Sequence, residues 1–273
     1  MKLSVSNIAW PAERDEMALD LIRRARISAV EVAPTRIWPQ WQGVSPASAA
    51  SAAQRLAGCG FHVSSLQALL FGKPDCQLLG SEEQQQALFD HLVVCADLAA
   101  GLGAKSLVFG APKNRTLCGR TEGEAFHVAR EFFRACGRFF AERGLCLCLE
   151  PNPPQYGCEF ITNSTQAANL VRAVDSQGFR LHLDTGCMHM SHEDPAQAIR
   201  LNADILQHFH VSEPFLESIE ATTCNHHQIG RTLREVDYAG WVTLEMRATE
   251  QSLAALAGSI DIFVKGYAPE AVN

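Results

Sequence analysis

Four residues in the second half of the chain have side chains that could together bind a metal ion. Glu150, Asp184, His210 and Glu245 are separated by 34, 26 and 35 residues, and each lies at the end of a short apolar stretch. Three carboxylates in an enclosed space would repel one another and take up protons unless a cation neutralised them. Oxygen donors with one imidazole suit Mn²⁺, Mg²⁺ or Co²⁺ better than structural zinc, which favours thiolates. The sequence therefore predicts a site for a divalent metal ion.

The stretch RLHLDTGCMHM (180–190) contains one of these residues and allows three interpretations. Asp184, Cys187 and His189 could belong to a metal site, to a thiol-based active site, or to a buried strand that happens to carry polar residues. A catalytic thiolate needs an adjacent base, and none is evident beside Cys187. We therefore favour the metal site, with the segment TGCMH as a turn that follows the strand.

Short apolar segments alternate with longer amphipathic ones along the chain, which predicts strands followed by helices. Eight such units in 273 residues, at a mean spacing of about 34 residues, match a single-domain (β/α)8 TIM barrel over residues 1–273. A doubly wound sheet is the rival fold, but no Gly-rich nucleotide fingerprint follows Trp10. The expected strands are 2–10, 28–34, 61–71, 106–112, 145–151, 180–185, 205–213 and 241–247.

The alternation of side chains along these strands predicts which residues face the barrel interior. In the fifth strand Cys146 and Cys148 share a face with Glu150, while the intervening leucines take the other face. The other three candidate ligands likewise lie opposite the aliphatic side chains of their strands. In a barrel the active site lies at the carboxyl ends of the strands. The four ligands are therefore expected to converge there, on strands five to eight.

Composition narrows the classes of function. The net charge of −7 disfavours binding to nucleic-acid backbones, which needs clustered lysine and arginine. No apolar run approaches the length of a membrane span, and the N-terminus lacks the apolar segment and cleavage site of a signal peptide. The ten cysteines are scattered and include no CxxC pair, which is typical of reduced thiols. We expect a cytoplasmic protein with no nucleic-acid or membrane partner.

Several motifs together are similar to the xylose isomerase-like TIM-barrel superfamily, in its sugar (phosphate) isomerase/epimerase branch. They are LEPNPPQYGCEFITN around Glu150, LHLDTG around Asp184, HVSEP from His210 and YAGWVTLEM ending just after Glu245. The resemblance covers most of the chain, including SNIAW, EVAPTRIW and VFGAPKNR. It implies that Glu150, Asp184, His210 and Glu245 bind one divalent metal ion, and that Glu150 and Glu245 also act as the catalytic acid/base pair.

The resemblance implies a metal-dependent isomerase or epimerase that moves a proton alpha to the metal-bound carbonyl of a ketose, inosose or related polyol-ketone. Mn²⁺ is the first choice of ion, with Mg²⁺ or Co²⁺ as alternatives, and a homo-oligomer is an open alternative to a monomer. A metal-dependent dehydratase (lyase) of an inosose or dehydroshikimate-like substrate is the runner-up, because it begins with the same proton abstraction. An apurinic endonuclease is less favoured, since the third and fourth strands end without histidine. The intact ligand set disfavours a non-catalytic barrel.

Loop residues near the strand ends are candidates for contacts with the substrate. Ketose epimerases carry a substrate-orienting histidine three residues after the metal-binding aspartate, and this chain has Cys187 there. His189, two residues further on, could replace it. Glu31 and Gln67 end the second and third strands and are expected to line the pocket. The candidate substrate-binding residues are Glu159, Cys187, His189, Glu213, His226 and Arg247.

Overall fold

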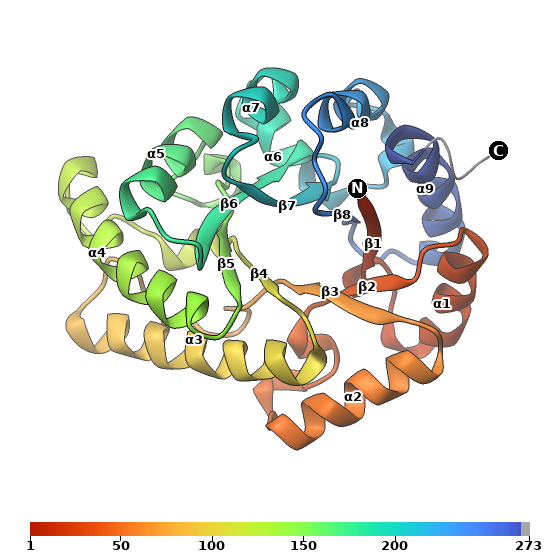
Figure 1. Cartoon of the computed structure of the whole chain (residues 1–273), viewed down its shortest axis with the longest axis horizontal. Coiled ribbons are helices and arrows are strands. Elements are labelled where there is room, and N and C mark those ends of the chain that lie inside the picture. The colour runs from red at the N-terminus through yellow and green to blue at the C-terminus, as the bar shows by residue number, and fades with distance from the viewer. Residues whose placement is uncertain (269–273) are drawn as a thin grey trace.

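Eight parallel strands form a closed barrel in the computed structural model, which describes residues 1–268 (Figure 1). Neighbouring strands pair in chain order, and the first strand also pairs with the last. The predicted (β/α)8 TIM barrel is confirmed. The strands are β1 (Lys2–Ser6), β2 (Ala29–Val32), β3 (His62–Leu66), β4 (Ser106–Phe109), β5 (Cys146–Leu149), β6 (Phe179–Asp184), β7 (Leu206–Val211) and β8 (Trp241–Leu244).

Helices surround the barrel on its outer side (Figure 1). Ser81 and Thr121 start two of them with capping boxes, each with the residue three positions later. Within residues 1–268, no helix is long and apolar enough to span a membrane. The α-helices are α1 (Asp15–Arg24), α2 (Pro46–Gly58), α3 (Glu82–Leu102), α4 (Glu122–Ala141), α5 (Ser164–Val174), α6 (Thr185–Met190), α7 (Pro195–Asn202), α8 (His226–Glu235) and α9 (Ser252–Tyr267).

Several strands end earlier than the sequence predicts. The predicted first and third strands extend well beyond Ser6 and Leu66, where β1 and β3 end. Ala68 has a φ of 52°, in the left-handed region that a strand does not use. Leu69 is buried although it lies in the loop. The apolar run therefore continues into a packed loop, which periodicity alone does not distinguish from a strand.

The connection after β6 contradicts the expectation of a turn. The segment TGCMHM forms the short helix α6, and a second helix, α7, follows before β7. Asp184 caps α6, because its Oδ1 accepts a hydrogen bond of 2.6 Å from the backbone N–H of Cys187. The residue that ends β6 therefore also starts a helix.

The two faces of the strands differ as predicted. Leu147, Leu183 and Leu244, on the outer face, are fully buried in the hydrophobic core between strands and helices. In that core Phe179 stacks on Phe133 of α4, with ring centroids 4.4 Å apart. Buried polar groups require hydrogen-bond partners, so the interior of the barrel needs a network. Its buried polar side chains include Ser4, Glu31, Ser65, His182, His208 and Thr243.

Candidate metal centre

The four predicted metal ligands lie together at the carboxyl ends of β5 to β8. Ligand atoms of Glu150, Asp184 and His210 are within 4.8 Å of one another. Nδ1 of His210 is 3.1 Å from Oε2 of Glu245. All four residues are buried, the most exposed being Glu150 at 9%. The geometry is therefore that of an enclosed cluster of three carboxylates and one imidazole, as the sequence predicts.

The orientation of the His210 ring fits metal coordination. Its Nε2 lies 3.1 Å from Oε1 of Glu31 and donates a hydrogen bond to it. Its Nδ1 is buried and makes no hydrogen bond, although Oε2 of Glu245 is 3.1 Å away. Histidines that bind metals usually donate their second ring nitrogen to a carboxylate or carbonyl. The residues present therefore fit a divalent cation held through Nδ1 of His210.

The charges of the cluster also favour a cation. Burial, followed by the nearby Asp184 carboxylate, raises the pKa of Glu150 from 4.5 to about 8. Burial likewise raises the pKa of Glu245, with the carboxylates of Asp184 and Glu31 adding to it and His210 opposing it. Carboxyl groups with raised pKa values hold protons that a divalent cation can displace.

The pKa of the His210 imidazole is also shifted. Burial alone would lower the pKa of its imidazole, but the carboxylates of Glu31 and Glu245 outweigh burial and raise it. Burial would raise the pKa of Glu31, but His210 outweighs it and the pKa is lowered. Without a cation, His210 and Glu31 therefore form a buried ion pair, and cation binding must remove a proton from His210.

Asp184 is held from two sides. Its Oδ1 accepts from the backbone N–H of Cys187, and its Oδ2 accepts from the Ser212 hydroxyl at 2.7 Å. The Ser212 hydroxyl also accepts from the backbone N–H of Gly186 at 3.2 Å. These bonds join α6 to the end of β7, and they fix the direction of the carboxylate.

Residues that follow β4 contact Glu150. Arg115, which is fully buried, donates at 3.1 Å to the backbone carbonyl of Glu150 and at 2.6 Å to Oδ1 of Asn152. Gly110 directly follows β4 and leaves room for the carboxylate, because a Cβ there would overlap Oε2 of Glu150. Neither role was predicted, since each depends on contacts between two loops that are distant in sequence.

Gly110→Ala is expected to weaken metal binding by on the order of 10- to 100-fold without unfolding the barrel. The added methyl group must displace the Glu150 carboxylate, which is the end of a side chain and can move. Titration calorimetry with Mn²⁺ measures the affinity, and thermal unfolding of the metal-free protein measures stability. Gly123→Ala is the matched control, because a Cβ at that position meets no atom within 4 Å. Equal Mn²⁺ affinity in the two variants would contradict the role of Gly110.

Glu213 and His226, two of the predicted substrate contacts, are hydrogen-bonded to each other. Oε1 of Glu213 lies 3.2 Å from Nε2 of His226 and accepts from the backbone N–H of Cys224 at 3.0 Å. His226 Nδ1 lies 3.1 Å from the hydroxyl of Tyr267. These contacts connect the end of β7 to α8 and α9. Oε2 of Glu213 is buried and has no hydrogen-bond partner, and contact of either residue with a substrate stays a prediction.

Three other predicted substrate contacts lie toward the surface. Glu159 is exposed, and its carboxylate accepts from the backbone N–H of Leu117 at 2.8 Å. His189 is exposed on α6 and lines a cavity that contains none of the four ligands. The side chain of Arg247 is exposed and pairs with Glu217. The structure gives each a surface environment, and their contact with a substrate remains a prediction.

Cys187 lies beside the cluster as a buried thiol. Burial, followed by the Asp184 carboxylate, raises its pKa well above the usual thiol value. All ten cysteines are free, in line with the expectation of reduced thiols. A thiol that resists ionisation is a poor nucleophile, so the structure does not support a thiol-based active site.

A cavity of about 690 Å³ opens beside the cluster and has Glu245 in its wall. This volume is in the range of small-molecule sites. The polar groups in its wall include Gln67, as predicted, and Arg36, which was not predicted. Nothing in the spacing of Arg36 marks it, because the loop after β2 brings it to the cavity. Apolar side chains such as Ile8 and Phe71 line much of the rest.

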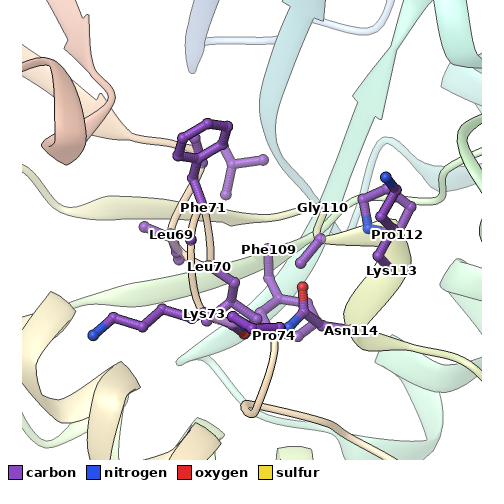
Figure 2. A pocket seen from close by; sticks show the side chains of 14 residues that line it. Leu69, Leu70, Phe71, Lys73, Pro74, Phe109, Gly110, Pro112, Lys113 and Asn114 are labelled. Carbon is purple, nitrogen blue, oxygen red and sulfur yellow. The ribbon is translucent and has the colours of Figure 1, made fainter. Parts of the chain in front are cut away.

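A second cavity, of about 530 Å³, lies between the loops after β3 and β4 (Figure 2). The two cavities share Ala68, Phe71 and Gly72 as a common wall. None of the four ligands lines the second cavity. The first cavity is therefore the one next to the groups that could do chemistry.

The chain is a (β/α)8 barrel with a buried cluster of carboxylates and one imidazole at its mouth, and comparison with known families identifies it further. A family model described as xylose isomerase-like TIM barrel matches residues 19–264. The chain belongs to this family, which confirms the resemblance of its motifs. No protein with a curated description matches the chain in sequence.

Solved structures share this fold at low sequence identity. D-psicose 3-epimerase, solved in the presence of D-fructose, is 16% identical with a TM-score of 0.78, over 98% of this chain and 99% of its own. 3-keto-D-glucoside 4-epimerase from E. coli is 18% identical with a TM-score of 0.74, over 96% and 98%. An AP endonuclease of family 2 from Brucella melitensis is 16% identical with a TM-score of 0.73, over 94% and 98%. At these identities the likeness shows the fold.

Proposed function

We propose that this protein is a divalent-metal-dependent sugar epimerase or isomerase that acts on a ketose, an inosose or a related polyol-ketone. The observation that carries the proposal is the buried cluster of Glu150, Asp184, His210 and Glu245 at the mouth of the barrel, next to a cavity of about 690 Å³. The names of two structural neighbours, a psicose 3-epimerase and a keto-glucoside 4-epimerase, favour the same reaction class. Mn²⁺ is the proposed ion.

Glu150 and Glu245 are the proposed acid/base pair. They follow β5 and β8, the outer strands of the arc that carries the cluster, so they approach a substrate from different sides. One carboxylate removes the proton alpha to the carbonyl, and the other, as a carboxylic acid, returns a proton to the opposite face or to the adjacent carbon.

A bound divalent cation would polarise the substrate carbonyl and stabilise the negative charge that develops on its oxygen. The protein's own groups orient the substrate relative to the two carboxylates. The polar side chains in the cavity wall can bind substrate hydroxyls, and they are Thr35, Arg36, Gln40, Gln67 and Glu245. Phe71 and Ile8 supply apolar surface in the same wall.

A substrate screen in D₂O tests the proposal. Ketoses, inososes and hydroxy-keto acids are incubated with the protein and Mn²⁺, and NMR follows both deuterium uptake and products. An epimer or isomer carrying deuterium at the α-carbon is the expected result. A dehydrated product would instead establish the lyase alternative. If no substrate of these classes exchanges a proton, the proposed function is wrong.

A nuclease function has weaker support, although one structural neighbour is an AP endonuclease. The strands β3 and β4 end without histidine. The histidines that would bind the additional zinc ions of an apurinic endonuclease are therefore missing from those two strand ends. The net charge of −7 also disfavours a DNA substrate. Cleavage of abasic DNA by the Zn²⁺-loaded protein is therefore not expected.

A further inference from the structure

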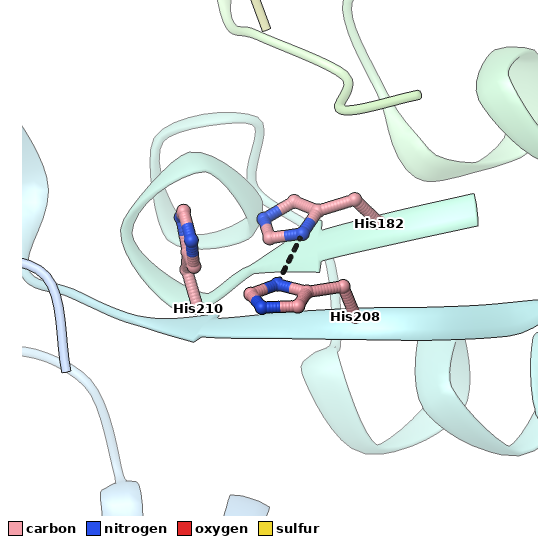
Figure 3. Close-up of side chains that lie close together, drawn as sticks. All are labelled: His182, His208 and His210. Carbon is pink, nitrogen blue, oxygen red and sulfur yellow. Dashed lines mark hydrogen bonds between the residues drawn. The ribbon is translucent and has the colours of Figure 1, made fainter. Parts of the chain in front are cut away.

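His182 has a buried ring nitrogen with no hydrogen-bond partner, and this nitrogen faces the metal ligands. Its ring is fully buried, and Nε2 lacks a partner. Figure 3 shows this nitrogen on the side of His182 that faces His210, and the two ring centroids are 4.2 Å apart. Oε1 of Glu150 is 3.6 Å from the same nitrogen, too far for a hydrogen bond.

A chain of hydrogen bonds in the barrel determines which nitrogen of each ring carries a proton. The chain begins at Glu31, whose Oε1 accepts from the Ser65 hydroxyl at 2.6 Å. Since the one hydroxyl proton of Ser65 is used there, its oxygen must accept from Nε2 of His208, which is 2.9 Å away. His208 is therefore protonated on Nε2, and its Nδ1 carries a lone pair.

The next link sets the tautomer of His182. Nδ1 of His182 is 3.2 Å from Nδ1 of His208 (dashed line in Figure 3). Because the His208 nitrogen can only accept, His182 must donate from Nδ1. The Nε2 of a neutral His182 then carries a buried, unpaired lone pair near Glu150. An unpaired lone pair among carboxylates is unfavourable unless a cation or a proton lies beside it.

The Glu31 carboxylate also determines which nitrogen of His210 carries a proton. Glu31 accepts from Nε2 of His210, which leaves Nδ1 free to bind a cation. Glu31 thus leaves a lone pair on Nδ1 of His210, which is 3.1 Å from Glu245, and one on Nε2 of His182, which is 3.6 Å from Glu150. The distance of 3.6 Å between Nε2 of His182 and Oε1 of Glu150 suits two donors on one ion, since bonds of about 2.1 Å place neighbouring donors about 3 Å apart.

We propose that His182 is a fifth protein ligand of the metal centre, presented by the hydrogen-bond chain that begins at Glu31. This inference rests on the proposed metal-dependent function and adds a ligand that the spacing of the strand ends does not predict. Two imidazoles among the donors shift the preference of the site from Mg²⁺ toward Co²⁺ and Mn²⁺, because imidazole is a poorer ligand for Mg²⁺.

His182→Asn tests the assignment. Asparagine can replace Nδ1 of the histidine and keep the bond to His208, but it has no group at the position of Nε2. Titration calorimetry is expected to show Co²⁺ affinity lower by on the order of 10- to 100-fold and Mg²⁺ affinity changed by less than about threefold. The visible absorption bands of the Co²⁺-loaded protein are expected to change as well.

His91→Gln is the matched control. It also replaces a buried imidazole, and glutamine can keep the 2.8 Å hydrogen bond of His91 Nε2 to the carbonyl of Leu69. The control is expected to retain the Co²⁺ affinity and absorption bands of the unmodified protein. Loss of both in the control would mean that the changes in His182→Asn report general damage, and the assignment would then depend on the measurement that uses no variant.

Pulsed electron paramagnetic resonance of the unmodified, Mn²⁺-loaded protein needs no variant. Nitrogen couplings from two imidazoles are expected, and couplings from only one would overturn the assignment of His182. An unchanged Co²⁺ spectrum and affinity in a folded His182→Asn protein would overturn it too. If the unmodified protein binds none of Mn²⁺, Co²⁺ and Mg²⁺, it is the proposed metal-dependent function that fails.

Discussion

Glu245→Gln is expected to lower the rate of deuterium exchange at the substrate α-carbon by about 10²- to 10⁴-fold, the usual contribution of a general acid or base. Glutamine keeps the shape of the side chain but can neither take nor return a proton. The measurement is NMR of the identified substrate in D₂O at saturating Mn²⁺, with metal content determined in the same sample. Glu150→Gln is expected to have a loss of similar size.

The control for this prediction must separate chemistry from metal loss. Glu235→Gln changes an exposed carboxylate on α8 that pairs with Arg200, and it is expected to exchange at the unmodified rate. Metal occupancy of Glu245→Gln must be restored by raising the Mn²⁺ concentration before the rates are compared. A metal-loaded Glu245→Gln protein with full exchange activity would show that another group moves the proton.

Mn²⁺ is expected to stabilise the protein more at about pH 8 than at about pH 6.5, because the cation must displace protons from Glu150 and His210. The affinity for Mn²⁺ increases up to about tenfold per pH unit for each proton that the cation displaces. Each tenfold increase adds about 1.4 kcal/mol to the free energy of unfolding of the metal-bound protein. Thermal unfolding with and without Mn²⁺ at both pH values measures the difference. An equal increase in Tm at both pH values would show that the ligands are already deprotonated.

The metal-free protein is expected to behave in the opposite way. The folded-state pKa of Glu150, about 8, is above its unfolded value of 4.5, so the protonated carboxyl contributes stability that is complete below about pH 4.5. That contribution is lost as the pH rises through about 8. Tm of the metal-free protein should therefore fall between about pH 6.5 and 8. Glu150→Gln should reduce this fall, and an unchanged slope would exclude Glu150 as its source.

The sequence by itself was sufficient to predict the fold and the clustering of the four candidate ligands. Strand alternation puts Glu150, Asp184, His210 and Glu245 on the inner face, and a spacing of one strand–helix unit puts them at the same end of the barrel. Both properties are local, since they depend on the period of a strand and the length of a repeat. The predicted face and barrel end of each residue are therefore correct even where the predicted strand end is wrong by several residues.

Only the tertiary structure decided the surroundings of these ligands. Glu213 and His226 bond to each other, and His226 also bonds to Tyr267, which the sequence does not indicate. Arg115 lies in the loop after β4, yet it is fully buried and donates to the backbone carbonyl of Glu150. The conformation of the loops determines where these side chains lie. Loop sequences have no regular period from which the position of a side chain could be predicted.

The tautomers of the interior histidines show the same division most clearly. The sequence places His182, His208 and His210 on the inner face, but it does not tell which nitrogen of each ring carries a proton. That depends on Glu31 and Ser65, which lie more than a hundred residues away in the chain and meet the histidines only across the closed barrel. Alternation determines the face of a strand, whereas hydrogen bonds across the barrel determine what each side chain can bind.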